Sequence, residues 1–221
     1  MPDVKRAKLA ISKRGGFAPR ERKFIKKELL VRIVNWCVEN KKWLLYAKLF
    51  VFTYAFLLRL PSEALPATAG SQDSQSSLEI CGDDIVLRLR RRKNKPSGSV
   101  ISRRCLCRQC KTICPFHTLL PLLNSSDEGG RIFGTISASS ALRVLRSILE
   151  ALGVPDAALY RTHDLRRGHC MDLLESGAPL ATILKAGEWR SPAFLSYVDM
   201  EQLERDAVIQ AHLDDSDCEP G

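Results

Sequence analysis

The sequence has no apolar segment of the length that a membrane-spanning helix needs. Residues 43–58 are strongly apolar, but Lys48 interrupts them and Arg59 ends them, which leaves Leu49–Leu58 as the uncharged run. A helix that crosses a bilayer needs about 20 apolar residues, so we expect this segment to be a buried core helix. The first 22 residues are basic and polar and lack the apolar stretch of a signal peptide. We therefore expect an intracellular protein that has no membrane partner.

Acidic residues are also scarce relative to basic ones. The chain has 25 Asp and Glu against 34 Lys and Arg, which gives a net charge of +9. This surplus favours a polyanionic partner, with nucleic acid as the first candidate and an anionic membrane surface as the second. Because an intracellular compartment keeps thiols reduced, the eight cysteines are expected to be free thiols or metal ligands rather than disulfides.

The hydrophobic periodicity predicts a mainly α fold with a small antiparallel β-sheet, organised as one domain without internal repeats. Ile85, Leu87 and Leu89 alternate with Val86, Arg88 and Arg90, which is the period of a strand with one cationic face. Ser99–Arg103 is expected to pair with this strand after a turn at 94–98. Helices are expected at 19–40, 41–59, from Pro61 onwards, and at 115–123, 138–152, 161–176, 180–186, 192–197 and 201–212.

The expected domain spans residues 24–213, with a basic flexible arm before it at 1–23 and an acidic tail after it at 214–221. A cysteine-rich insertion occupies about 104–117. The hairpin that precedes this insertion is strongly cationic, and a face of this kind suits contacts with the DNA backbone that carry no sequence information. The ordinary alternative is a solvated strand face. The charged residues are Arg88, Arg90, Arg91, Arg92, Lys93, Lys95, Arg103 and Arg104.

The C-terminal third contains residues suited to phosphoryl transfer. The segment Thr162-His163-Asp164-Leu165-Arg166 places a histidine and an arginine one helical turn apart, so that both can reach one phosphate. Arginine suits a phosphate clamp because its planar guanidinium bonds two oxygens and stays charged. Taken singly, each residue has an ordinary interpretation: His163 and Arg166 as a solvated helix face, and Tyr197 as a core aromatic.

The ordered set Arg…His-x-x-Arg…His/Trp…Tyr resembles the tyrosine recombinases, the phage-type integrases. Leu58-Arg59-Leu60-Pro61-Ser62-Glu63-Ala64-Leu65 is similar to the family's first arginine motif. His163 and Arg166 match the His-x-x-Arg box, Trp189 matches the His/Trp position, and Tyr197 matches the nucleophile. The resemblance covers roughly residues 24–212. The local sequences around Lys93 and Trp189 are similar to those of recombinases of eukaryotic mobile elements.

The resemblance implies the fold of a tyrosine recombinase catalytic domain and a reaction without a catalytic cofactor. Arg59 and Arg166 would grip the scissile phosphate of double-stranded DNA, His163 would donate a hydrogen bond or shuttle a proton, and Trp189 would help to position the phosphate. Tyr197 would attack and form a 3′-phosphotyrosyl bond, and a hairpin lysine, Lys93 or Lys95 with Lys93 preferred, would protonate the leaving 5′ oxygen. Further DNA contacts are expected from Arg92, Lys95, Arg167 and Arg190.

This chain departs from the family pattern in two places. Trp189 lies eight residues before Tyr197, one fewer than in many members, so Glu188 competes for the position. Residues 1–23 are also too few for the helical domain that completes the family's clamp around DNA. The alternatives are therefore a non-enzymatic DNA-binding module and a DNA-relaxing enzyme of the type IB topoisomerase kind. Helix 201–212 is expected to dock on a neighbouring protomer, and a nuclear location is expected.

The cysteine-rich insertion carries five potential zinc ligands. Its pattern is Cys105-x-Cys107-x-x-Cys110-x-x-x-Cys114-x-x-His117, and thiolate and imidazole ligands suit zinc. Cys105, Cys107, Cys114 and His117 would form a structural Cys₃His site that holds the insertion together. The alternative is a loop of reduced cysteines without metal.

Overall fold

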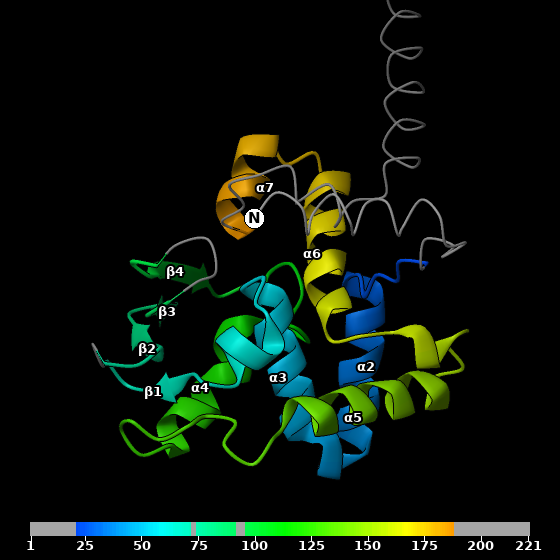
Figure 1. Cartoon of the computed structure of the whole chain (residues 1–221), viewed down its shortest axis with the longest axis horizontal. Coiled ribbons are helices and arrows are strands. Elements are labelled where there is room, and N and C mark those ends of the chain that lie inside the picture. Colours follow the sequence, from blue (N-terminus) through cyan, green and yellow to red (C-terminus); the bar gives the residue numbers. More distant parts are fainter. Residues whose placement is uncertain (1–20, 72–73, 92–95, 188–221) are drawn as a thin grey trace, which may run out of the picture.

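A computed structural model describes residues 21–71, 74–91 and 96–187. These residues form a helical domain with one small sheet, as the sequence predicts (Figure 1). The helices are α2 (Lys27–Glu39), α3 (Leu44–Ala55), α4 (Pro115–Ser125), α5 (Ala138–Ala151), α6 (His163–Glu175) and α7 (Leu180–Gly187). Short turns of helix lie at Lys41–Trp43, Leu60–Ala64 and Ala157–Leu159, and the strands are β1 (Thr68–Ala69), β2 (Ser77–Cys81), β3 (Asp84–Leu89) and β4 (Ser99–Arg104).

Helix α3 lies at the centre of the domain because it is apolar on nearly all sides. Eight of its residues are buried, and it packs against α2, α4 and α6. Figure 1 shows α3 between the sheet on one side and α2 and α6 on the other. This confirms the prediction that residues 43–58 contain a core helix. In the described part of the chain, no helix has both the length and the apolarity that a membrane crossing requires.

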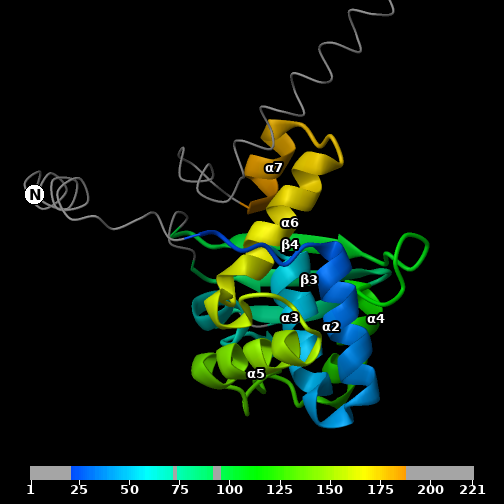
Figure 2. The ribbon, with the colours of Figure 1, turned by 90° about the vertical axis from the view of Figure 1, so that its right-hand side faces the viewer.

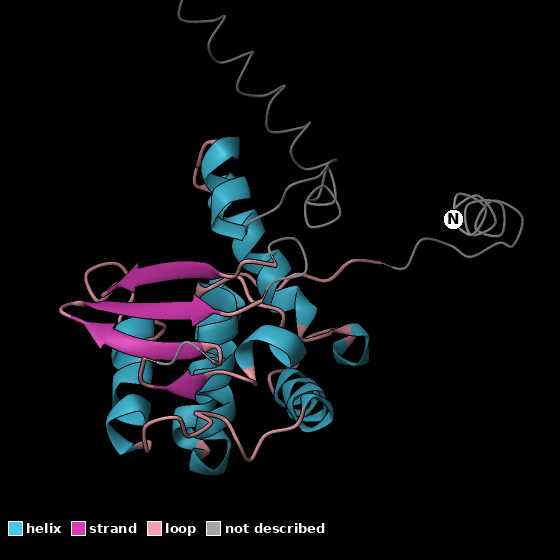
Figure 3. Ribbon diagram, turned by 60° about the vertical axis from the view of Figure 1, so that its left-hand side comes forward, coloured by secondary structure: helices cyan, strands magenta, loops and turns pink. Residues whose placement is uncertain are grey.

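The sheet is larger than predicted and is not purely antiparallel. Its order is β1-β2-β3-β4, and β1 pairs with β2 in parallel whereas the other pairs are antiparallel. The predicted hairpin is present as β3 and β4, with Leu87 opposite Ile101. Ile85, Leu87 and Leu89 point into the core, as their alternation predicts. Helix α4 covers the sheet by packing against β2, β3 and β4 (Figure 3).

The segment before α2 is extended and lies along α6. The amide of Ile25 donates to the carbonyl of Asp164 at 3.0 Å, and the amide of Lys27 donates to the carboxylate of Asp172 at 2.9 Å. Ile25 is fully buried. The described segment before α2 therefore packs against α6, and Figure 2 shows it crossing in front of that helix.

Candidate functional site

Arg59 is positioned by the abrupt end of α3. The chain turns at Leu57, whose φ of 52° is unusual for a residue with a side chain, and the amide of Leu58 donates to the carbonyl of Thr53 at 2.9 Å. Arg59 is then extended and precedes the helical turn Leu60–Ala64. This turn corresponds to the short helix predicted from Pro61, and it brings Glu63 back over Arg59.

Glu63 joins the first arginine to the histidine-arginine box. It is 2% exposed, and its Oε1 lies 3.0 Å from Nη1 of Arg59. Its Oε2 accepts from the Arg59 amide at 2.8 Å and lies 3.6 Å from Nη1 of Arg166. Arg59 and Arg166, 107 positions apart in the sequence, are therefore held on one buried carboxylate.

Arg166 and His163 lie on α6 in different surroundings. The Arg166 side chain is 2% exposed, and its Nη2 donates to the carbonyl of Gly187, at the end of α7, at 2.8 Å. His163 is half-buried at the start of α6. Asp164, between them in sequence, organises this end of the helix by accepting from the Arg161 amide and from Nη1 of Arg167, both at 2.8 Å.

His163 is held in its neutral form at pH 7. Burial lowers its pKa to about 4, and the positive charges of Arg167, Arg166 and Arg59 act in the same direction, partly offset by Glu63. The three guanidiniums are thus close enough to act electrostatically on one imidazole. A neutral imidazole carries one N–H donor, and an anion that entered this field would be attracted by the surrounding arginines.

A cavity of about 480 Å³ opens beside Arg59 and His163. Arg146 of α5 and Arg161 also line it, so three arginines and a histidine face one space. Arg146 is fixed by a 3.0 Å hydrogen bond from its Nε to the carbonyl of Tyr160. A smaller cavity of about 260 Å³ is lined by His163, Arg161 and Arg167 but also by the carboxylates of Glu21 and Asp164. The larger space has the charge and size for a phosphate group.

The structure thus brings together three of the predicted catalytic residues, Arg59, His163 and Arg166. The sequence analysis did not assign Arg146 and Arg161 to the site. Arg161 directly precedes the Thr-His pair and could have been included on that ground, but Arg146 comes from a helix whose sequence has no motif. Of the predicted DNA contacts, Arg167 is described and donates to Asp164. The remaining predicted catalytic and DNA-contacting residues lie outside the described residues: Arg92, Lys93, Lys95, Trp189, Arg190 and Tyr197.

The charged face of the hairpin is partly used within the molecule. Arg88 forms an ion pair with Glu79 at 2.7 Å, and Nη1 of Arg90 donates to the carbonyl of Ser74 at 2.7 Å. Arg103 turns inward and donates from Nε to the carbonyl of Ala55 at 2.7 Å. The hairpin is therefore less uniformly open than its composition predicts.

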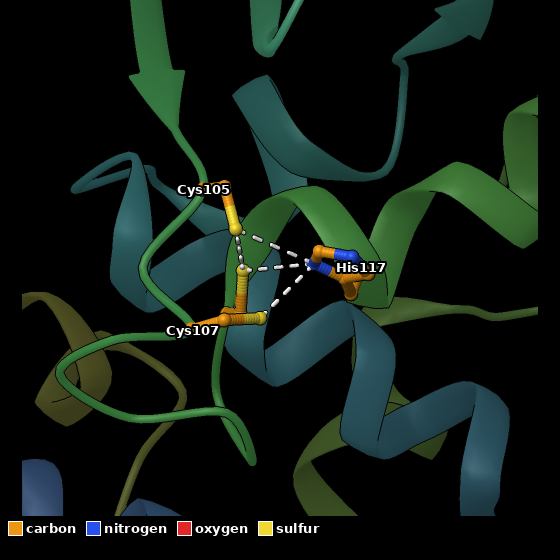
Figure 4. A group of neighbouring side chains, drawn as sticks. Cys105, Cys107 and His117 are labelled. Atoms are coloured by element: carbon orange, nitrogen blue, oxygen red, sulfur yellow. Dashed lines mark hydrogen bonds between the residues drawn. The ribbon is translucent and has the colours of Figure 1, made fainter.

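The four predicted metal ligands meet at the junction of β4 and α4. Cys105 and Cys107 follow β4, Cys114 is the N-cap of α4, and His117 lies in the first turn of that helix. Their ligand atoms lie within 4.8 Å of one another and could hold a metal ion. Figure 4 shows Cys105 and Cys107 directed toward His117. Among the described residues, Cys110 does not belong to this group; it is half-buried and packs against the core.

Four of the six pairs of ligand atoms lie 3.1–3.8 Å apart, and all six lie within 4.8 Å. Nδ1 of His117 lies 3.6 Å from the Cys105 sulfur, 3.1 Å from that of Cys107 and 3.5 Å from that of Cys114. The sulfurs of Cys105 and Cys114 are 3.8 Å apart. The Leu106 amide donates to the Cys114 sulfur at 3.2 Å. Burial alone would raise the pKa of Cys114, but hydrogen bonds from His117 and Leu106 lower it to about 6, which favours a thiolate.

Comparison of the sequence with models of protein families finds no family that matches, and comparison with curated proteins finds no relative.

Proposed function

We propose that this chain is the catalytic domain of a tyrosine recombinase and that it cleaves and rejoins DNA through Tyr197. The observation that carries the proposal is the meeting of Arg59, His163 and Arg166 around Glu63, beside a cavity lined by further arginines. These residues come from two segments far apart in the sequence, and the family motif names the same three. Residues picked at random from two distant segments would rarely meet in this way.

Glu63 supports a phosphate clamp by orienting the two arginines. A guanidinium held on one edge by a carboxylate keeps its other donors in a fixed plane. In this proposal Arg59, at the edge of the cavity, would bind one non-bridging oxygen of the scissile phosphate. Arg166, which is deeper, would strengthen the positive field and reach the phosphate as it seats. His163, neutral at pH 7, would donate its N–H to a phosphoryl oxygen.

The reaction would replace one phosphoester bond of the scissile phosphate by another. The hydroxyl oxygen of Tyr197 attacks the phosphorus, a phosphotyrosyl bond forms, and the bond from phosphorus to the 5′ oxygen breaks. The proton of the Tyr197 hydroxyl would pass to the unprotonated ring nitrogen of neutral His163. The leaving oxygen would take a proton from the hairpin lysine, Lys93 or Lys95, while Trp189 packs against the phosphate. Attack by a 5′-hydroxyl of another strand reverses these steps. The number of phosphoester bonds is conserved, so the exchange needs no external energy source.

The partner would be double-stranded DNA, bound in a nucleus by electrostatic contacts from Arg92, Lys95, Arg167 and Arg190. Assembly of protomers on DNA through residues 201–212 would complete the exchange. Sedimentation of the protein with and without a short duplex tests this assembly, and imaging of a fluorescent fusion tests the location.

We also propose that the Cys₃His cluster binds zinc in a structural role. Zinc bonds of ~2.3 Å to sulfur and ~2.0 Å to nitrogen place tetrahedral ligands about 3.8 Å apart for two sulfurs and about 3.5 Å for sulfur and nitrogen. The observed separations of 3.8, 3.6 and 3.5 Å agree with these values, and that of Cys107 at 3.1 Å is shorter. Four protein ligands fill a tetrahedron and leave no position for substrate.

The decisive experiment uses a nicked suicide duplex, from which the cleaved fragment diffuses away. The protein should become trapped on DNA as a band that resists denaturant. Tyr197→Phe should abolish the band and leave non-covalent binding nearly unchanged, because one hydroxyl contributes little beside the phosphate contacts. Tyr160→Phe is the matched control, since Tyr160 is a buried tyrosine, and it should keep the band.

The clamp is tested by Arg59→Ala, which should lower the cleavage rate about a hundredfold or more. Arg32→Ala provides the matched control, because Arg32 is exposed on α2 and its guanidinium donates to the carbonyl of Leu152 at 2.9 Å, away from the cavity. A band that survives Tyr197→Phe would show that another residue attacks. Failure of every form to give a band would favour the non-enzymatic DNA-binding module, and relaxation of supercoiled DNA without strand exchange would favour the topoisomerase alternative.

A further inference from the structure

Arg103 links the metal cluster to the end of the central helix. It lies on β4, two residues before Cys105. Its Nε donates to the carbonyl of Ala55, the last residue of α3, at 2.7 Å, and its guanidinium carbon lies 5.4 Å from the centre of the Phe56 ring. The last carbonyls of a helix have no partner within the helix, so Arg103 supplies one from the sheet.

The neighbouring carbonyl is held from the other side of the domain. Nδ1 of His169 on α6 donates to the carbonyl of Tyr54 at 2.6 Å, and the two rings stack with their centres 4.4 Å apart. The end of α3 is therefore fixed by one side chain from β4 and one from α6. Both arrive at consecutive carbonyls, directly before the chain turns at Leu57.

This end of α3 determines where Arg59 lies. The turn at Leu57 has a left-handed backbone that a leucine adopts only when its surroundings impose it. The amides of Leu57 and Leu58 close the turn by donating to the carbonyls of Tyr54 and Thr53, at 3.0 and 2.9 Å. Arg59 is the second residue after Leu57, so a displacement of the Ala55 carbonyl would also displace the backbone of Arg59.

β4 is paired with β3 as far as Arg104, and the candidate metal ligands begin at the next residue, Cys105. Within the segment 105–114, the backbone hydrogen bonds close local turns, such as those from the amides of Gln109 and Cys110 to the carbonyl of Leu106. A metal ion would tie Cys105 and Cys107 to the first turn of α4. Because metal binding supplies folding energy only while the ion is bound, the position of the β4 end would depend on occupancy.

From these contacts we infer that metal occupancy of the Cys₃His cluster controls the placement of Arg59, with Arg103 as the positioning residue that couples the two sites. The metal takes no part in the reaction; it holds β4, β4 holds the end of α3 through Arg103, and α3 holds Arg59. The inference rests on the proposed function for its effect on DNA cleavage, and on zinc or a similar ion for its ligand.

The first measurement needs no DNA. Amide hydrogen exchange is followed in the zinc-loaded chain, in the chelator-treated chain and in Arg103→Gln, which keeps all four ligands. The amides of Leu57 and Leu58 should exchange about tenfold faster in the second and third forms, as expected for loss of one charge-assisted hydrogen bond, while those of Val144 and Leu145 in α5 stay slow. Two matched controls are available: Cys110→Ser, outside the cluster, and Arg104→Gln, whose side chain is exposed on the same strand.

The second measurement is single-turnover cleavage of the suicide duplex beside equilibrium binding of an intact duplex. Arg103→Gln should lower the cleavage rate about tenfold at full zinc content while the affinity for DNA changes by less than a factor of two, because a positioning defect affects the transition state. Arg103→Lys, which keeps one donor for the Ala55 carbonyl, should recover part of the rate.

The outcomes separate the two proposals. Unchanged exchange at Leu57 and Leu58 in the chelator-treated chain or in Arg103→Gln, or the absence of metal from protein purified in zinc-containing medium, would overturn the coupling. If the zinc-loaded chain cleaves no DNA, the proposed function fails, and the exchange measurement still decides whether the cluster and the end of α3 are coupled. Should chelation unfold the chain, Cys107→Ser, which removes one ligand, takes the place of chelation, and unchanged exchange at Leu57 and Leu58 in that variant would likewise overturn the coupling.

Discussion

A single methyl group at Gly168 tests the packing that builds the site. Gly168 lies in the middle of α6, two residues after Arg166. A Cβ at this position would lie 1.8 Å from the carbonyl oxygen of Ile25, 2.2 Å from its carbon and 2.7 Å from the amide nitrogen of Lys26. Close carbon-oxygen contacts across packed backbones are about 3.3 Å or longer. The N-terminal segment would therefore have to move by about 1.5 Å.

The expected cost follows from the contacts that this movement breaks. In an exposed helix, glycine to alanine stabilises by about 1 kcal/mol. Here the movement would break the 3.0 Å hydrogen bond from the Ile25 amide to Asp164, which contributes about 1 kcal/mol, and would partly expose Ile25, at about 2 kcal/mol. With overpacking strain of about 1–3 kcal/mol, Gly168→Ala should be destabilising by about 3–5 kcal/mol. For a domain of this size, that corresponds to a fall in Tm of roughly 10 °C.

The measurement is urea unfolding followed by circular dichroism, with Tm from a thermal scan. Gly134→Ala serves as the control, because its Cβ would meet only the Arg131 side chain at 3.3 Å and the Arg131 carbonyl at 3.5 Å; we expect it to change stability by less than about 1 kcal/mol. A Tm for Gly168→Ala equal to or above that of the unaltered chain would refute the close approach of α6 and the segment before α2.

Three further predictions follow from charge and burial. Stability should fall as pH drops from 6.5 toward 4, because burial lowers the pKa of both His163 and His169 to about 4 and the unfolded chain therefore binds more protons in this window. The stabilisation present above pH 6.5 is lost by about 2 kcal/mol for each histidine at pH 5. His163→Gln should reduce the loss, and a flat profile of stability between pH 7 and 5 would contradict the burial of both rings. Glu63→Gln should lower the free energy of unfolding by ~3 kcal/mol, because it removes the carboxylate that Arg59 and Arg166 share in a buried site. A urea unfolding curve that matches that of the unaltered chain would show that the carboxylate is not needed to hold the two arginines. Affinity for DNA should fall steeply and linearly with the logarithm of salt concentration, since each phosphate contact releases counterions, and fluorescence anisotropy that changes little between low and physiological salt would exclude a cationic DNA-binding surface.

The sequence by itself determined the local elements and the chemistry of the metal cluster. Helical periodicity predicted α5 at 138–152, and the structure has it at Ala138–Ala151. Strict alternation predicted the buried face of β3. The four metal ligands were predicted from residue type and spacing, and the structure brings the same four together. These features depend on residues close in the chain, whose spacing fixes their relative positions. The roles of Lys93, Trp189 and Tyr197 stay predictions.

Only the tertiary structure decided how distant segments meet. Strand β1 has just two residues, Thr68 and Ala69, and no pattern of its own; it exists because β2 and the Arg131 segment pair with it. The turning of Arg103 into the core, away from the cationic hairpin face, depends on the Ala55 carbonyl 48 positions earlier in the chain. Likewise, a glycine in the middle of a helix is unfavourable by helix propensity, and the presence of Gly168 in α6 is explained only by the close approach of the Ile25 backbone. In each case the deciding contact joins groups on different elements of the fold. Periodicity carries no information about such pairs because it reports only which face of an element is buried.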